Sequence, residues 1–125
     1  MTSRARQTLG QTGERQAEDY LRRRGFRILV RHFRSPFGEI DIIARRRQVI
    51  HFCEVKTRRS MACGTPLEAV SFYKRRRLVK TALWYLGQRN DSEVDVRFSA
   101  LGITIAEHQQ PKIQWVEKAF DMDDI

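Results

Sequence analysis

The sequence has few of the features that mark thiolate-metal, disulfide-bonded or membrane proteins. Its two cysteines, Cys53 and Cys63, match neither a metal-ligand spacing nor a disulfide framework, and free thiols fit a reducing compartment. No apolar run reaches the roughly 18–20 residues of a membrane span. Residues 1–12 lack the apolar stretch of a signal peptide. A Gly-rich phosphate loop and a Ser-His-Asp arrangement are also missing. We therefore expect a cytoplasmic protein with no membrane partner.

The chain is strongly basic, and its charged residues are unevenly distributed along it. The 125 residues include 24 Lys and Arg against 15 Asp and Glu, a net charge of +9. Residues 1–90 hold 21 basic and 7 acidic residues, whereas residues 91–125 hold 3 and 8. A basic body suits a polyanionic partner, most often nucleic acid. A solvated basic surface explains the charge alone equally well.

Length and periodicity predict a single α/β domain over residues 1–125, with a frayed segment at 1–11 and an acidic tail at 121–125. The order α-β-β-β-α-β indicates a mixed β-sheet flanked by helices. The expected elements are a helix at 13–24, strands at 26–33, 39–45 and 48–57, a helix at 65–86, a strand at 95–105 and a short candidate fifth strand at 113–120.

Local signals fix several element ends and faces. Gly25 is expected to stop the first helix and Gly87 the second, and Thr65-Pro66-Leu67-Glu68 is a capping-box start for the second helix. Glu14 falls on the inward apolar stripe of the first helix. Trp84 and Tyr85 are interpreted as core residues rather than as a stacking platform, and His51 as structural.

Two strings place charged residues at the ends of apolar strands. In Val49 to Lys56, the side chains of Ile50, Phe52, Glu54 and Lys56 share one face, because strands alternate with period two. A hairpin would bring Asp41 alongside Glu54. Charges at the end of an apolar face are costly unless they are paired or bind a ligand. An ordinary ion pair between Glu54 and Lys56 or Asp41 is the alternative.

These residues are suited to a divalent-metal site. Mg²⁺ (or Mn²⁺) prefers oxygen ligands, and we expect them from Asp41, Glu54 and the backbone carbonyl of Val55. Such an ion lowers the pKa of a bound water and neutralises phosphate oxygens, which is what phosphodiester cleavage needs. Lys56 would orient or deprotonate the attacking water. Glu14, and less firmly Glu39, would hold a water or a second ion.

Basic residues next to this site are candidates for phosphate contacts. Arg58 and Arg59 directly follow the acid-x-lysine string and are expected to hold the strand to be cleaved. Lys74, Arg75, Arg76 and Arg77 form a dense basic run on the second helix, for which a solvated face is an equal alternative.

The ordered motifs resemble a known family. The strings GEID at 38–41, EVKTR at 54–58 and GTPLEAV at 64–70, followed by Lys74, resemble the YraN-like family of bacterial proteins. That family in turn resembles the PD-(D/E)xK, restriction endonuclease-like nucleases, including archaeal Holliday-junction resolvases. The resemblance implies Asp41, Glu54 and Lys56 as the catalytic triad and Glu14 as the helix acid. It departs at His32, near which the family usually has Asn, and at Ser99, where it has Asp.

Two functions from different classes follow from the sequence. The first is a Mg²⁺-dependent endonuclease acting on DNA, branched or otherwise structured. The second is a nucleic-acid-binding module with a nuclease fold and no turnover. A third interpretation, an assembly protein with a protein partner, has only the basic charge in its support. Symmetric cutting of a four-way junction would require a homodimer with two sites, for which the sequence shows no decisive patch.

Overall fold

The computed structural model describes residues 9–59, 72–89 and 94–120, which form an α/β domain. The elements, in chain order, are α1 (Leu9–Arg23), β1 (Arg27–Ser35), β2 (Gly38–Arg46), β3 (Val49–Arg58), α2 (Phe72–Gly87), β4 (Asp95–Thr104) and β5 (Lys112–Phe120). The expected α/β order is confirmed, and the candidate fifth strand is present as β5.

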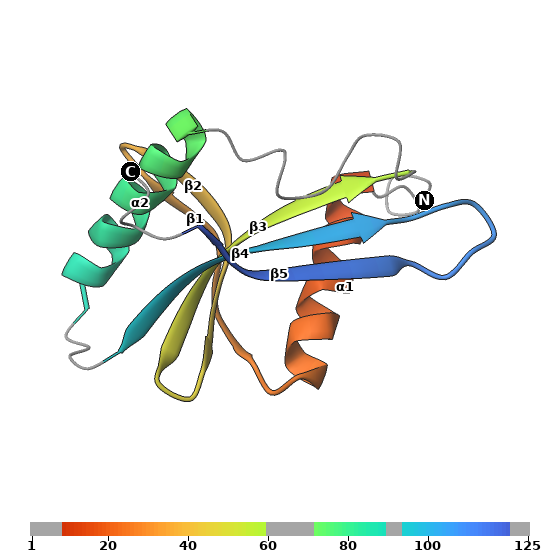
Figure 1. The fold of residues 1–125 in the computed structure, drawn as a ribbon, viewed down its shortest axis with the longest axis horizontal. Helices are drawn as coiled ribbons and strands as arrows, with labels where there is room; N and C mark the ends of the chain where they lie inside the picture. The colour runs from red at the N-terminus through yellow and green to blue at the C-terminus, as the bar shows by residue number, and fades with distance from the viewer. Residues whose placement is uncertain (1–8, 60–71, 90–93, 121–125) are drawn as a thin grey trace, which may run out of the picture.

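The strands form one mixed sheet in the order β1-β2-β3-β4-β5 (Figure 1). β3 and β4 run parallel, and the other neighbouring pairs are antiparallel. Parallel neighbours cannot be joined by a tight turn, so the chain must cross one face of the sheet between them. α2 lies on this crossover, and its first turn reaches the polar end of β3, where Lys74 contacts Glu54.

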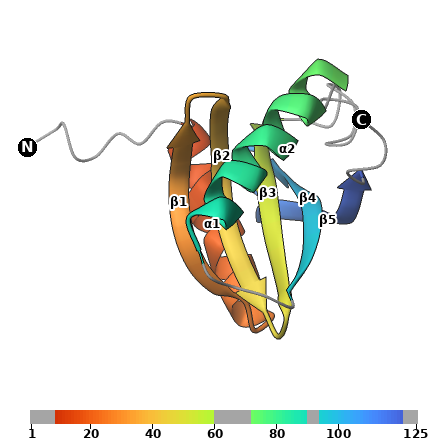
Figure 2. The same cartoon turned by 90° about the vertical axis from the view of Figure 1, so that its left-hand side faces the viewer.

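The two helices cover opposite faces of the sheet (Figure 2). One apolar cluster lies under α2, and a second lies under α1. The first includes Ile40, Ile43, Ile50, Phe52, Leu78, Ala82, Tyr85 and Phe98, and the second includes Ala17, Leu21, Phe26, Ile42, Ala44, Cys53, Leu101 and Ile103. β2 and β3 therefore bury apolar side chains on both faces, as expected for central strands covered on both sides.

The end of α1 shows how sequence fixes its direction. Gly25 adopts φ +88°, a left-handed conformation that glycine tolerates without a Cβ clash. The amide of Gly25 donates to the carbonyl of Arg22, and the amide of Phe26 donates to that of Leu21. This is the Schellman arrangement, which satisfies the last helical carbonyls. It turns the chain so that Phe26 enters the core and β1 can begin.

A neutral histidine–serine pair is buried on the α1 side of β3. His51 Nδ1 lies 3.0 Å from Ser99 Oγ, and the imidazole packs against Phe26 and Trp115. Burial outweighs the nearby carboxylate of Glu117 and lowers the pKa of His51 to about 4. The position is consistent with the structural role expected for His51. Ser99, which stands where the resembling family has Asp, is a neutral partner for a neutral imidazole.

Some boundaries and burials differ from the expectations. α1 begins at Leu9, so residues 9–11 are helical rather than frayed. Once a helix is nucleated, each added residue gains one hydrogen bond, and polar residues extend it readily. Tyr85 is buried as expected, but Trp84 is 42% exposed, so its assignment to the core was wrong. Residues 1–8, Cys63, the capping box at 65–68 and the tail at 121–125 lie outside the described residues.

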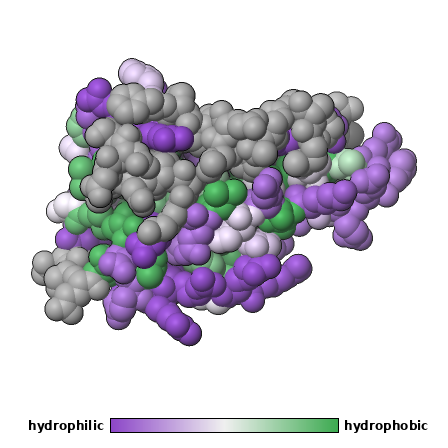
Figure 3. Space-filling model, viewed as in Figure 1, coloured by the Kyte–Doolittle hydropathy of each residue, from purple (hydrophilic) through white to green (hydrophobic). Residues whose placement is uncertain are grey.

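One face of the molecule carries large areas of polar side chains among the described residues (Figure 3). On the face in Figure 3, hydrophilic residues cover the lower rim and the right-hand end, and hydrophobic surface is broken into smaller areas between them. In the described ranges, no helix has the length and apolar character needed to span a membrane.

Candidate functional site

The site lies where β2 and β3 separate. Their register runs from Arg46 opposite Val49 to Ile42 opposite Cys53, and it stops before Asp41 and Glu54. At this point the amide of Val55 donates a 2.8 Å hydrogen bond to Oδ2 of Asp41. A side-chain carboxylate thus takes the place of a backbone acceptor. This bond fixes Asp41 beside the polar end of β3.

Asp41 is surrounded by other acids. Burial raises its pKa to about 6, and the carboxylates of Glu54, Glu14 and Glu39 contribute in the same direction. The hydrogen bond from Val55 opposes the shift but does not cancel it. Carboxylates crowded in a half-buried place repel one another unless a cation lies among them. This donor set fits a divalent cation that prefers oxygen ligands.

Glu54 lies between two lysines. Its Oε1 contacts the ammonium of Lys74, from α2, and lies 3.9 Å from Nζ of Lys56, two residues further along β3. The side chain of Glu54 is only 11% exposed. The 3.9 Å contact agrees with the expectation that Glu54 and Lys56 share a strand face, and it comes with an additional partner on α2.

The two lysines differ electrostatically. Burial lowers the pKa of Lys56, and the neighbouring ammonium of Lys74 lowers it further, which together outweigh the attraction of Glu54 and Asp41. Burial would also lower the pKa of Lys74, but its hydrogen bond and charge interaction with Glu54 raise it overall. Lys74 therefore stays charged and compensates Glu54, whereas Lys56 gives up its proton more readily.

Glu14 reaches the same region from α1. Atoms that Glu14, His32 and Asp41 can offer as ligands all lie within 4.8 Å of one another. Glu14 Oε2 is 2.8 Å from Nε2 of His32. The expected convergence of Glu14 and Asp41 is therefore present, although a histidine lies between them.

A close helix–strand approach places Glu14 here. Gly13 is buried against β3, and a Cβ at this position would lie 1.8 Å from Oγ1 of Thr57. Only glycine lets the α1 backbone lie so near the end of β3. Since Glu14 is the next residue, the depth of the helix sets the position of its carboxylate.

His32 is a site residue that the sequence did not identify. It has φ +52° within β1, a conformation in which Asn, Asp and His are enriched among non-glycine residues. Its Nδ1 lies 3.2 Å from Oε1 of Glu39, and this hydrogen bond, with the charges of Glu14 and Asp41, raises the pKa of His32 against the effect of burial. The resemblance supplied the only signal, since Asn suits the same backbone conformation.

Glu39 lies at the outer margin of the site. Its second oxygen is 3.0 Å from Nε of Arg34, and its side chain is 37% exposed. Glu39 is thus held by His32 and Arg34 rather than directed at Asp41. Its expected role in holding a water or a second ion stays a prediction.

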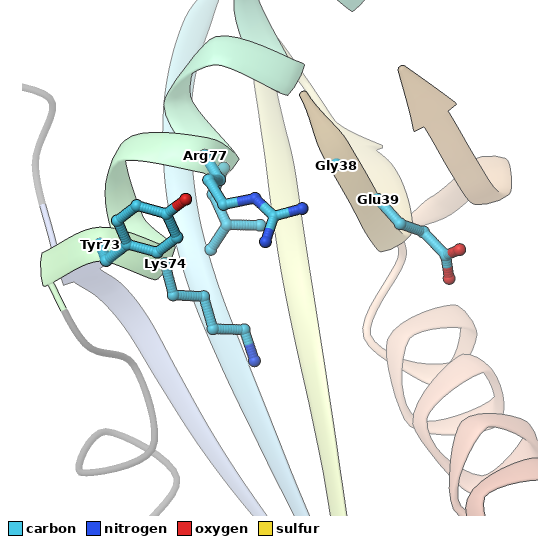
Figure 4. A pocket seen from close by; sticks show the side chains of 6 residues that line it. Gly38, Glu39, Tyr73, Lys74 and Arg77 are labelled. Atoms are coloured by element: carbon cyan, nitrogen blue, oxygen red, sulfur yellow. The ribbon is translucent and has the colours of Figure 1, made fainter. Parts of the chain in front are cut away.

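A pocket of about 310 Å³ opens between α2 and the start of β2. Figure 4 shows Arg77 extending from α2 toward Gly38, with Lys74 pointing down over the sheet and Tyr73 on the first turn of the helix. Nε of Arg77 donates a 3.0 Å hydrogen bond to the carbonyl of Phe37. The pocket, which Glu39 also lines, therefore adjoins the lysine that holds Glu54.

The remaining predicted basic residues lie at or just beyond the end of β3 and on α2. Arg58 is partly buried, and within the described part of the chain its Nη1 is buried without a hydrogen-bond partner. Arg59, Arg76 and Arg77 are exposed, and Arg75 is half-buried. Lys74 was expected on a phosphate-binding surface, and the structure adds its contact with Glu54. The phosphate contacts of all these residues stay predictions.

Comparisons with known proteins find matches that cover most of the chain. Residues 13–103 match the model of the uncharacterised protein family UPF0102. A UPF0102 protein of Syntrophotalea carbinolica is 40% identical over 94% of this chain and 95% of its own length. Relatives from Geotalea daltonii and Nocardia farcinica are 42% and 38% identical, each over 92% of this chain and 91% of their own length. The chain therefore belongs to the UPF0102 family.

Proposed function

We propose that this protein is a Mg²⁺-dependent endonuclease that hydrolyses phosphodiester bonds in DNA. One observation carries the proposal: where β2 and β3 separate, the charge of Glu54 helps raise the pKa of Asp41, and Nζ of Lys56 lies 3.9 Å from Oε1 of Glu54. Acids crowded in this way repel a nucleic acid unless they hold a cation. A protein that only bound DNA would have no use for them.

The cation would be held by Asp41, Glu54 and the carbonyl of Val55, with Glu14 as a further oxygen donor. When bound, Mg²⁺ would neutralise charge on the phosphate oxygens and lower the pKa of a bound water. The hydrogen bond from Val55 keeps Asp41 oriented. Lys74, on α2, contacts Oε1 of Glu54, on β3, and this contact limits the motion of the Glu54 carboxylate.

Lys56 is suited to the proton-transfer part of the reaction. A lysine with a lowered pKa is neutral more often near pH 7, so it can accept a proton or hydrogen-bond a nucleophilic water. In its charged form it can stabilise negative charge on the phosphate. Arg58 and Arg59 follow on the same strand end and would contact the flanking phosphates.

The alternative is a nucleic-acid-binding module without turnover. It is favoured by the internal partners of the acids, since Glu54 contacts two lysines and Glu14 contacts His32. These pairs compensate part of the negative charge without a metal. The two functions differ in whether the bound strand is cut.

The test is cleavage of labelled four-way-junction, flap, single-stranded and duplex DNA, with Mg²⁺, with Mn²⁺ and with EDTA. We expect metal-dependent products from the unmodified protein and none from Lys56→Ala. Lys112→Ala, at an exposed position on β5, is the matched control and should cut normally. Salt-sensitive binding with no cleavage of any substrate would instead support the binding module.

A further inference from the structure

The outer face of α2 presents aromatic and basic side chains in alternation. Tyr73, Arg77, Lys80 and Trp84 are spaced four, three and four residues apart, which places them along one side of the helix. All of them are exposed, Tyr73 by 72% and Trp84 by 42%. The apolar contacts of α2 with the sheet come from the other side, through Leu78, Ala82 and Tyr85.

Phe37, in the turn between β1 and β2, completes this surface. Its ring lies 6.0 Å from that of Trp84, and Nζ of Lys80 is 5.7 Å from its centroid. The guanidinium of Arg77 lies 5.9 Å from the ring of Tyr73 and binds the carbonyl of Phe37. We call the five residues Phe37, Tyr73, Arg77, Lys80 and Trp84 the aromatic–basic strip.

The composition of the strip indicates its occupant. Exposed rings offer π-faces on which bases stack, and the interleaved cations attract phosphates. The segment Phe72–Gly87 contains no Asp or Glu that would repel a nucleic acid. In a duplex the faces of the bases are covered by their neighbours, so the rings could engage only unpaired nucleotides. The cations would attract either form of nucleic acid, and the exposed rings favour a single strand.

The strip leads to the candidate catalytic residues. The pocket of about 310 Å³ is lined by Tyr73 and Arg77 from the strip and by Lys74, whose ammonium contacts Glu54. A strand stacked along α2 would therefore pass this pocket on its way to Glu54 and Asp41. We infer that the aromatic–basic strip binds an unpaired DNA strand, so that the substrates are DNAs with a single-stranded arm, such as flaps and overhangs.

This inference rests on the proposed function for the cleavage step, but binding of DNA to the strip can be measured when no cleavage takes place. Trp115→Phe leaves Trp84 as the only tryptophan. In EDTA, we expect an oligothymidylate to quench the fluorescence of this variant and a blunt duplex of two complementary strands at the same concentration to leave it unchanged. Equal quenching by both DNAs, or none by the oligothymidylate, would overturn the inference, whatever the outcome of the cleavage assays.

Substitutions give a second, independent readout. Tyr73→Ala and Trp84→Ala should each weaken single-strand binding about tenfold while duplex affinity changes little. Leu83→Ala is the matched control, because Leu83 is 53% exposed on the same helix but about 100° away from Trp84. Unchanged single-strand affinity in both variants would overturn the inference. The inference would also be overturned if sedimentation showed that the only effect of Trp84→Ala is to dissociate a dimer.

Discussion

Asp41 is the residue on which the electrostatics of the site depend most. Its carboxylate is half-buried, accepts a hydrogen bond from Val55 and faces three other carboxylates. A raised pKa means that the folded protein binds a proton at Asp41 more tightly than the unfolded chain does. In the absence of a cation, the charged form of Asp41 therefore destabilises the fold.

Asp41→Asn should stabilise the metal-free protein. In the unmodified protein, the destabilisation by charged Asp41 is absent below about pH 4, because the carboxyl is then protonated in both the folded and the unfolded state. It grows as the pH rises toward 6 and is complete above the folded pKa of about 6. We expect a gain on the order of 1–3 kcal/mol in the free energy of unfolding at pH 7.5. Denaturant unfolding in EDTA between pH 4 and pH 8 measures it.

Asp95→Asn is the control, since its side chain is 73% exposed on β4 and should show little pH-dependent gain. If the difference between Asp41→Asn and the unmodified protein does not change from pH 4 to pH 8, the acid-cluster explanation is wrong.

His32 places a competing cation among the acids. Its imidazole contacts Glu14 and Glu39, and its raised pKa keeps it charged at higher pH than a free histidine. His32→Asn removes this charge, and Asn tolerates the left-handed backbone. We expect the stabilisation by Mg²⁺ to be half-saturated at about three- to tenfold lower Mg²⁺ concentration at pH 6.5, with a smaller change at pH 8.5, where less of the His32 imidazole is charged.

Thermal unfolding across a Mg²⁺ titration measures this shift. His108→Asn is the matched control, because His108 also has a positive φ but is 89% exposed outside the site. An equal shift at both pH values would show that the charge of His32 is not the cause.

At the scale of elements, the site depends on how closely α1 approaches β3. Gly13 allows contact with Thr57, and the position of Glu14 follows from it. Gly13→Ala would force the helix outward by overpacking. We expect a loss of about 1–3 kcal/mol in the free energy of unfolding, together with a weaker stabilisation by Mn²⁺, because Glu14 is displaced from Asp41.

Gly87→Ala separates this effect from the general consequence of adding a methyl group to a helical glycine. A Cβ at Gly87 has no atom within 4 Å, so the variant should be nearly neutral. Thermal and denaturant unfolding, each with and without Mn²⁺, compare the two variants. A similar small effect in both would contradict the assigned role of Gly13.

The sequence predicted the elements better than the contacts between them. Strand alternation indicated the shared face of Glu54 and Lys56, and Gly25 indicated the end of α1. The sequence could not show that Lys74 contacts Glu54, because that contact depends on how the crossover helix α2 packs on the sheet. Nor could it place His32, whose role follows from a positive φ within a strand. Trp84 has core-like spacing, and only the packed helix shows which of its sides is covered.

At the scale of the whole molecule, the basic surface predicts salt-dependent DNA binding. Each phosphate contact releases counterions, so the logarithm of the affinity should fall linearly with the logarithm of the salt concentration. Arg59→Ala and Arg76→Ala, at exposed positions near the site and on α2, should each reduce the slope by about one. Fluorescence anisotropy across a salt series measures the slope.

Arg23→Ala, at the exposed end of α1, is the control and should leave the slope unchanged. An identical small effect in all three variants would indicate a diffuse basic surface rather than the predicted contacts.

The central claim is that Asp41 and Glu54, with the acids around them, hold a divalent cation. The most direct measurement is the melting temperature of the unmodified protein and of Glu54→Gln as Mn²⁺ is added. A ligand that binds only the folded state at ten times its Kd adds about 1.4 kcal/mol, or a few degrees for a domain of this size. We predict this rise for the unmodified protein and little or none for Glu54→Gln. An unmodified protein whose melting temperature does not respond to millimolar Mn²⁺ would contradict the claim.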